Sequence, residues 1–261
     1  MSRLIDKLTK TDRAAFQPMG FRTSRQTSAE SRLQLIVRTE LKSSITSDLI
    51  HGADALLLLS TKTLPPVKDL KSVIEPLADI PWGIYLQDAA ANKALSLIKA
   101  GCDFIIFSAA SMVSAIPRDD DIGKIIEVDS SIDDGLLRSV NDLTVDAVLV
   151  TDSLENEGPL VWHQLMIIQH VVNLLTKPVI VNVSLNTSEN ELEALWESGV
   201  DGVLVETDTG KPEGIKGLRS IIDRLPARSA QKQGKAEALL PYPGGAKAAE
   251  PEPEEDDEDW E

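Results

Sequence analysis

The stretch DALLLLS at residues 54–60 decides the fold, because three later segments repeat its pattern of one aspartate followed by an apolar run. The repeats are DFIIFSA at 103–109, DAVLVTD at 146–152 and DGVLVET at 201–207. Successive opening aspartates lie 49, 43 and 55 residues apart, so each interval has room for one further strand and helix. The pattern predicts a chain that is built in quarters.

A second set of apolar segments fills the intervals between these repeats. Its members are LQLIVRTE from Leu33, IPWGIYLQD around Pro81, GKIIEVD from Gly123 and KPVIVNVSL around Pro178. All eight segments alternate with amphipathic stretches. Strict alternation of strand and helix predicts an α/β protein with a parallel sheet, and eight such units in roughly 200–250 residues fit a closed (β/α)8 barrel.

The chain is expected to have three parts, of which the middle one is the barrel. Residues 1–31 are an N-terminal arm, residues 32–225 the barrel and residues 226–261 a tail. The barrel is near the lower size limit, so its loops must be short. The arm is therefore interpreted either as a cover for the barrel mouth, in place of longer loops, or as a plug at the bottom.

The tail has no helical or strand period and is dominated by proline, glycine, alanine and charged residues, which predicts disorder. Nine acidic residues lie within residues 250–261, so the formal charge of −16 falls to −7 for the rest of the chain. An acidic balance repels phosphate backbones and anionic lipid, so nucleic acid and membranes are not expected partners. Trp260 is either a short anchor for a basic protein partner or part of a tail that only keeps the protein soluble.

One cysteine is present, Cys102, which excludes an internal disulfide. No charged-then-apolar leader and no run of about 18 apolar residues occurs, so the protein is expected to be cytoplasmic. Cys102 precedes the fourth strand, at the end of the barrel opposite to where barrel chemistry occurs. It is therefore interpreted as a buried structural thiol rather than as a nucleophile.

Strand alternation identifies the side chains that point into the barrel. Successive residues of a strand face opposite sides, and the face that touches the outer helices must be continuously apolar. On the first strand this rule places Leu35 and Val37 outside and Arg38 and Glu40 inside. The polar residues that it points inward near the strand ends are Arg38, Glu40, Tyr85, Gln87, Ser108, Glu127, Asp129, Thr151, Asn182, Ser184 and Glu206.

These polar side chains predict a site at the carboxyl ends of the strands, where barrel enzymes place their chemistry. Buried carboxylates that face one arginine must either have raised pKa values, as a general acid or base needs, or be neutralised by a cation. We expect catalytic carboxylates at Glu127, Asp129 and Glu206, and substrate-binding side chains at Arg38, Gln87, Asn182 and Ser184. Oxygen ligands without histidine or cysteine would suit Mg²⁺ or Mn²⁺.

A structural alternative stays open for the same residues. Arg38 could pair with Glu206 on the adjacent last strand and with Glu40, which would make an internal salt-bridge layer. Two other chemistries are not expected. No lysine is expected on the inner face of a strand near its carboxyl end, where a Schiff-base aldolase needs one, and His51, His163 and His170 are all expected on helices, which argues against a histidine-liganded zinc hydrolase.

The repeated aspartate entry, the proline-led strands and the helix-ending glycines Gly52, Gly101 and Gly199 make residues 32–225 resemble the aldolase-type TIM-barrel superfamily. Within it, the pyruvate-type class II aldolases are similar in placing a metal-binding glutamate after strand five and an aspartate after strand six. The resemblance implies metal ligands at Glu127 and Asp152. Those enzymes have a glutamine two residues before the glutamate, where this chain has Ile125.

One predicted helix is too apolar for an ordinary outer helix of a barrel. It runs from Pro159 to Leu175 with the sequence PLVWHQLMIIQHVVNLL, and its polar residues are scattered rather than gathered on one face. An outer helix needs a single buried stripe. The surplus apolar residues predict a second buried contact, either with the N-terminal arm or with another subunit, as in a homo-oligomer.

Two functions from different classes are consistent with these patterns. The first is an enzyme of lyase or isomerase type that acts on a small polar or anionic molecule, because proton abstraction beside a carbonyl needs only a carboxylate and an electrophile. The second is a non-catalytic barrel that acts as a scaffold through its arm, its apolar helix and its tail.

Overall fold

The computed structural model describes residues 2–13, 32–40, 51–59, 80–86, 100–119, 121–151, 158–207 and 212–226. By internal contacts the chain divides into two units, Met1–Gln231 and Lys232–Glu261. The second unit lies outside the described residues, as does the whole predicted tail apart from Pro226. The predicted bounds of the arm and the tail therefore stay predictions.

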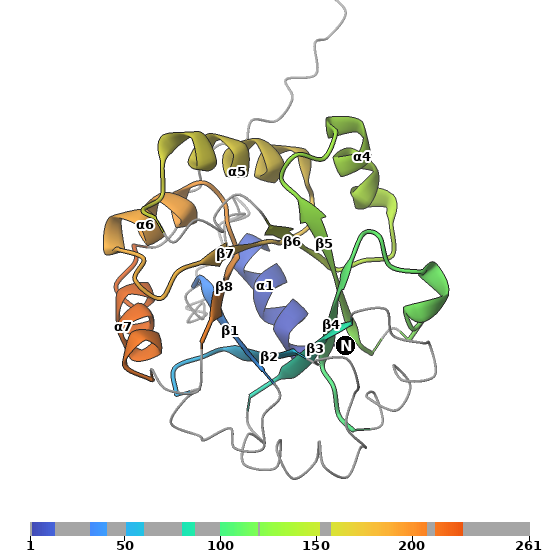
Figure 1. Cartoon of the computed structure of the whole chain (residues 1–261), viewed down its shortest axis with the longest axis horizontal. Coiled ribbons are helices and arrows are strands. Elements are labelled where there is room, and N and C mark those ends of the chain that lie inside the picture. Colours follow the sequence, from blue (N-terminus) through green and yellow to red (C-terminus); the bar gives the residue numbers. More distant parts are fainter. Residues whose placement is uncertain are drawn as a thin grey trace, which may run out of the picture. The chain divides into compact units, whose positions relative to one another are not determined.

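Eight parallel strands form a closed barrel in sequence order, which confirms the predicted (β/α)8 fold (Figure 1). The last strand pairs with the first and closes the ring. Each strand falls within a segment that the sequence pattern singled out. The strands are β1 (Gln34–Glu40), β2 (Ala55–Leu59), β3 (Trp82–Leu86), β4 (Phe104–Ser108), β5 (Gly123–Asp129), β6 (Ala147–Thr151), β7 (Val179–Val183) and β8 (Gly202–Glu206).

In the described residues, helices lie against the outside of this ring, and one further helix is seen within the outline of the ring (Figure 1). The outer helices among the described residues are α4 (Asp134–Ser139), α5 (Trp162–Leu174), α6 (Glu189–Glu197) and α7 (Pro212–Ile222), with short 3-10 turns η3 (Val113–Ala115) and η4 (Val140–Asp142). The inner helix is α1 (Arg3–Arg13). In the described ranges, every helix is too short or too polar to cross a membrane.

Helix α6 begins after Ser188, whose side chain and backbone bond to Glu191. The Ser188 N–H donates to Glu191 Oε2 at 2.7 Å, as in a capping box, and the Ser188 hydroxyl donates to the same oxygen at 2.6 Å. The Leu160 N–H donates to the other oxygen of the same carboxylate at 2.6 Å and so ties α6 to the segment before α5. These hydrogen bonds hold the pKa of Glu191 below its usual range.

The strand residues divide into two cores, as the alternation rule predicts. Leu35 and Val37 of β1 pack between the strands and the outer helices, and Ile36 packs inside the barrel. Inside a tilted barrel, residues at one height come from alternate strands and advance by about one position per strand. With the observed registers, the inner apolar layers contain Leu57, Ile106, Leu149 and Leu204; then Ile36, Gly83, Ile125 and Ile180; and lowest Ala55, Phe104, Ala147 and Gly202.

The four repeated aspartates bind backbone groups at the feet of the strands. The Leu35, Lys124 and Val179 N–H groups donate to the carboxylates of Asp54, Asp146 and Asp201, at 2.8 to 3.0 Å. Each aspartate N–H donates back to the carbonyl of the same residue, at 2.7 to 2.9 Å. Each aspartate therefore joins the start of an even strand to the start of the odd strand before it.

Asp103, the fourth repeat, uses its carboxylate to hold the N-terminal helix. Its oxygens accept from the Ser2 hydroxyl at 2.8 Å and from the Arg3 and Leu4 N–H groups at 2.8 and 3.0 Å. A carboxylate at this place satisfies N–H groups that a helix start leaves without intrahelical partners and interacts favourably with the helix dipole. The amino-terminal end of α1 is thus fixed at the foot of β4.

The apolar face of α1 closes the bottom of the barrel. Leu4, Ile5 and Leu8 are buried in the inner core. Two strand-opening glycines make room for them, since a Cβ on Gly123 would lie 2.7 Å from Ile5 and one on Gly202 would lie 3.1 Å from Leu8. Of the two interpretations of the arm, the bottom plug is confirmed for α1. Arm residues 14–31 lie outside the described ranges.

Cys102 is buried at the foot of β4, as expected, and its Sγ donates to the Phe104 carbonyl at 3.2 Å. Burial raises the pKa of this thiol to about 12, so it stays protonated at neutral pH. Gly52, Gly101 and Gly199 all have positive φ angles, of 104°, 91° and 97°, at the turns that lead into aspartate-opened strands. A left-handed backbone explains glycine at these turns.

Replacing Asp103 tests whether the plug stabilises the barrel. We expect Asp103→Ala to lower the free energy of unfolding by about 1–3 kcal/mol, because two backbone N–H groups and one hydroxyl lose their acceptor. Urea unfolding measures this change, and Glu197→Ala on the exposed side of α6 is the control. Equal stability of the Asp103 variant and the wild type would show that α1 is not held as described.

Candidate active site

A single polar layer lies above the apolar layers of the barrel interior. The layer follows from the strand registers, because residues at one height inside a barrel advance by one position from each strand to the next. From Arg38 on β1 this step leads to Tyr85 on β3, Glu127 on β5 and Asn182 on β7, and then back to Arg38. These four residues come from alternate strands, as in a regular barrel layer. The layer lies toward the carboxyl ends of the strands.

Tyr85 and Glu127 bond to each other inside this layer. The Tyr85 hydroxyl donates to Glu127 Oε2, across the intervening strand β4. Burial raises the pKa of Tyr85 well above its usual range, and the hydrogen bond to Glu127 raises it further. The phenol therefore stays protonated at any physiological pH and acts as a fixed donor to the carboxylate.

Arg38 forms the second polar pair, with Glu206 on the neighbouring strand. Its Nη2 lies 2.6 Å from Glu206 Oε2. The two side chains differ in environment, since 26% of the Arg38 side chain is exposed and 61% of the Glu206 side chain. The predicted Arg38–Glu206 bridge is therefore present, but it lies at the solvent side of the layer, where such pairs contribute about 0–1 kcal/mol.

Two buried polar atoms of the layer have no hydrogen-bond partner within the described residues. They are Arg38 Nε, a donor, and Asn182 Oδ1, an acceptor. A buried polar atom that stays unpaired costs about 1–3 kcal/mol. Such a cost is commonly found where a structure is arranged to bind a ligand or an ordered water.

The predicted site residues at the strand ends form hydrogen bonds with residues close to them in sequence. Asp129 Oδ1 accepts from the Ser131 N–H and hydroxyl, at 2.7 and 2.6 Å, and Asp129 is exposed. The Ser108 hydroxyl accepts from the Ala110 N–H at 3.2 Å, and the Ser184 hydroxyl accepts from the Asn186 N–H at 3.3 Å. These contacts are turns that begin the loops after the strands.

The structure thus separates the predicted site residues into three groups. Arg38, Glu127 and Asn182 lie in one layer, with Glu206 bonded to Arg38. Asp129 is the last residue of β5 and Ser184 directly follows β7, so both lie nearer the carboxyl ends of the strands than that layer. Gln87 and Asp152 lie outside the described residues.

The described residues supply one of the two implied metal ligands, Glu127, and one of its oxygens already accepts from Tyr85. No group of three or more histidine, cysteine, aspartate or glutamate side chains that could hold a metal occurs among the residues that the structure describes. Glu127 and Asp152 as ligands of Mg²⁺ or Mn²⁺ remain a prediction.

Sequence reasoning placed Tyr85 on the inner face but did not identify it as the partner of Glu127. The two residues lie on strands that are not neighbours, so their contact depends on the tilt of the barrel. The one-position step per strand is the signal that could have found the pair, once the register of each strand is known.

Comparison with known proteins supports the fold and no more. No family model matches the chain, and no curated protein matches it. A mutant tryptophan synthase alpha-subunit from Pyrococcus furiosus is 13% identical with a TM-score of 0.54, and the match covers 74% of this chain and 97% of that one. Thiamine phosphate pyrophosphorylase from Pyrococcus furiosus is 15% identical with a TM-score of 0.54, over 73% of this chain and 96% of that one.

N-(5'-phosphoribosyl)anthranilate isomerase from Pyrococcus furiosus is 14% identical with a TM-score of 0.52, and the match covers 74% of this chain and 100% of that one. The architectural resemblance expected from the sequence is therefore confirmed, and the chain has a TIM-barrel fold. A likeness at this level of identity carries no reaction with it.

The Tyr85–Glu127 bond predicts how the two tyrosines of the chain ionise. Tyr85 should not ionise until the protein unfolds, because burial and Glu127 both favour the neutral phenol. Tyr242, which the sequence predicts to be solvated, should ionise near pH 10. Phenolate absorbance followed from about pH 8 to 12 measures both steps.

Two variants assign these steps. Tyr242→Phe should remove the early step, and Tyr85→Phe should remove only the step that accompanies unfolding. Two tyrosines that both ionise near pH 10 would contradict the buried bond.

Proposed function

We propose that the protein is an enzyme of lyase or isomerase type that acts on a small anionic metabolite at the carboxyl ends of its barrel strands. The observation that supports this proposal is the polar layer of Arg38, Tyr85, Glu127 and Asn182 above the apolar layers of the interior. A barrel that only needs to be stable gains nothing from burying unpaired polar atoms there.

Glu127 is the proposed general acid and base. Its side chain is only half-buried and belongs to a rigid strand, and Tyr85 fixes one of its oxygens. Because Tyr85 bonds to Oε2, proton transfer falls to Oε1. A carboxylate held in one orientation can remove a proton from the carbon beside a carbonyl and return it elsewhere on the substrate.

Arg38 is the proposed binding group for the anion. Its Nη2 already bonds to a carboxylate, and its Nε lies buried without a partner in the described part of the chain. These two nitrogens form one edge of the guanidinium, which binds a carboxylate in a bidentate manner. A substrate carboxylate that displaces the exposed Glu206 would therefore satisfy both nitrogens.

Asn182 narrows the substrate class further. Its Oδ1 needs a donor, which a hydroxyl or amino group of the substrate would supply. We therefore propose a small hydroxy- or amino-carboxylate. Asp129, Ser184 and Glu206 complete the proposed site at the strand ends, and Gln87 and Asp152 belong to it by sequence alone, since both lie outside the described residues. In the alternative role of Glu127, as a ligand of Mg²⁺ or Mn²⁺ together with Asp152, the metal ion would polarise the carbonyl of the substrate.

The second candidate function is a non-catalytic scaffold. The observation that favours it is the exposed apolar surface of α5, where Trp162 is 81% and Met166 is 67% exposed. The part of the arm that forms α1 is bound inside the barrel, so it is not available to a partner. A scaffold does not account for the polar layer, and for that reason we favour the enzyme.

A ligand screen with a matched arginine variant tests the anion site. Thermal unfolding is measured with small hydroxy- and amino-carboxylates, with and without Mg²⁺ or Mn²⁺. A ligand at about 100 times its Kd should raise Tm by roughly 5–10 °C in the wild type. Arg38→Gln should abolish this shift, and Arg138→Gln on α4 should keep it.

The control variant removes an exposed arginine far from the barrel interior. No shift of the wild type with any carboxylate or with either metal would count against catalysis. A shift that survives in Arg38→Gln would place the ligand elsewhere.

Proton abstraction by Glu127 has a readout that does not require the full reaction to be known. Ligands from the screen are incubated in deuterated water, and exchange of the proton beside the carbonyl is followed by NMR. Glu127→Gln should slow this exchange by about 10²–10⁴-fold and still bind the ligand. Exchange at the wild-type rate in this variant would exclude Glu127 as the base.

A further inference from the structure

Helix α5 differs from every other described outer helix in having no charged side chain. Its sequence WHQLMIIQHVVNL contains no aspartate, glutamate, lysine or arginine, although such residues make up 26% of the chain. By contrast, α6 carries four glutamates, and α4 and α7 each carry both an acidic and a basic residue. Only Ile168 and Val171 of α5 are fully buried. The helix is therefore apolar well beyond the stripe that it packs against the barrel.

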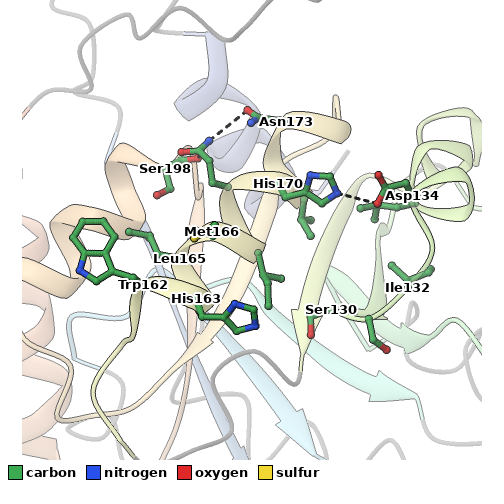
Figure 2. A pocket seen from close by; sticks show the side chains of 15 residues that line it. Ser130, Ile132, Asp134, Trp162, His163, Leu165, Met166, His170, Asn173 and Ser198 are labelled. Carbon is green, nitrogen blue, oxygen red and sulfur yellow. Dashed lines mark hydrogen bonds and ion pairs between the residues drawn. The ribbon is translucent and has the colours of Figure 1, made fainter.

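Figure 2 shows the side chains that line a pocket over α5. Trp162 and Met166 lie one turn apart and are largely exposed. Both line a hollow of about 770 Å³, whose opposite wall is formed by the loop after β5 and by α4. We call this surface the α5 face. It is lined in part by Ile132, Leu137, Trp162, His163, Met166 and His170.

The α5 face has almost no net charge. Among the described residues of its lining, the one acidic side chain is Asp134, whose Oδ1 lies 2.9 Å from His170 Nε2. No lysine or arginine occurs in this described lining. Polar groups at its edge are amides and hydroxyls, such as Gln169 and Asn173. An apolar centre with an uncharged polar edge is the usual composition of a protein–protein interface core.

Charge and existing contacts argue against two segments of the same chain as the cover of this face. The acidic run at residues 250–261 holds nine carboxylates, and the described lining of the α5 face contains no lysine or arginine that would attract them. Helix α1 is held in the barrel by Asp103. Neither of these segments of the same chain fits the α5 face.

We propose that the α5 face is the two-fold interface of a homodimer. Two chains with a formal charge of −16 each repel one another unless they meet where neither carries much net charge, and the described lining of the α5 face, with Asp134 bonded to His170, meets that condition. A two-fold interface also requires one surface to be complementary to itself. Trp162 and Met166 of one copy would enter the hollow of the other, and tryptophan and methionine are enriched at interface centres.

Sedimentation velocity over about 1–100 µM protein tests the proposal. The wild type should be dimeric in this range. Met166→Glu should weaken the dimer by at least about 30-fold, since each dimer then buries two carboxylates at its centre. The matched control is Met112→Glu, because Met112 is also an exposed methionine, at 77%, and lies outside the α5 face. Both variants should keep the wild-type Tm in the monomeric range.

The salt dependence of the dimer tests whether the interface is held by apolar contacts rather than by ion pairs. Raising the ionic strength from about 0.05 to 0.5 M should leave the dimer unchanged or tighten it, because salt screens the repulsion between two acidic chains. A wild type that stays monomeric throughout, or a dimer that withstands Met166→Glu, would overturn the proposal. Neither outcome bears on Glu127 or Arg38, so the proposed function is tested separately.

Discussion

The bond between the Asp103 carboxylate and the start of α1 is the contact on which the rest of the barrel interior depends. An eight-stranded barrel must fill its inside with side chains, and its lower end would otherwise expose the small residues Ala55, Ala147 and Gly202. Leu4, Ile5 and Leu8 supply the missing apolar volume. Because this end is sealed by a helix that the aspartate holds, only the carboxyl ends of the strands remain for a ligand.

The barrel interior therefore changes from apolar at the bottom to polar at the carboxyl ends of the strands. Apolar layers follow the plug, and the ring of Phe104 fills the space that Gly83 leaves empty, since a Cβ there would lie 2.4 Å from the ring. The polar layer then replaces apolar packing with a fixed phenol–carboxylate bond and a guanidinium whose Nε lies buried without a partner in the described part of the chain. A binding site that is preorganised needs rigid packing beneath it and polar groups that are still able to bond to a ligand. The apolar layers supply the packing and the polar layer supplies the groups.

Sequence reasoning predicted the strands, their order and the inward direction of Glu127, because alternation and spacing are local properties of the chain. It predicted less of the site. Asp129 and Ser184 were expected on the inner face, and their bonds to Ser131 and Asn186 follow from the turn after each strand, which strand alternation does not describe. The opening aspartates were treated only as markers of a repeat, although their carboxylates bind the neighbouring strands and α1.

The sequence by itself determined that the chain is an eight-unit barrel, that its acidic charge is concentrated at the carboxyl end and that one outer helix is unusually apolar. The tertiary structure decided which polar residues meet. Arg38, Tyr85, Glu127 and Asn182 share a layer because barrel tilt advances the register by one residue per strand, and α1 fills the bottom because Asp103 captures its first N–H groups. Both depend on contacts between residues distant in sequence, which local patterns along the chain do not encode.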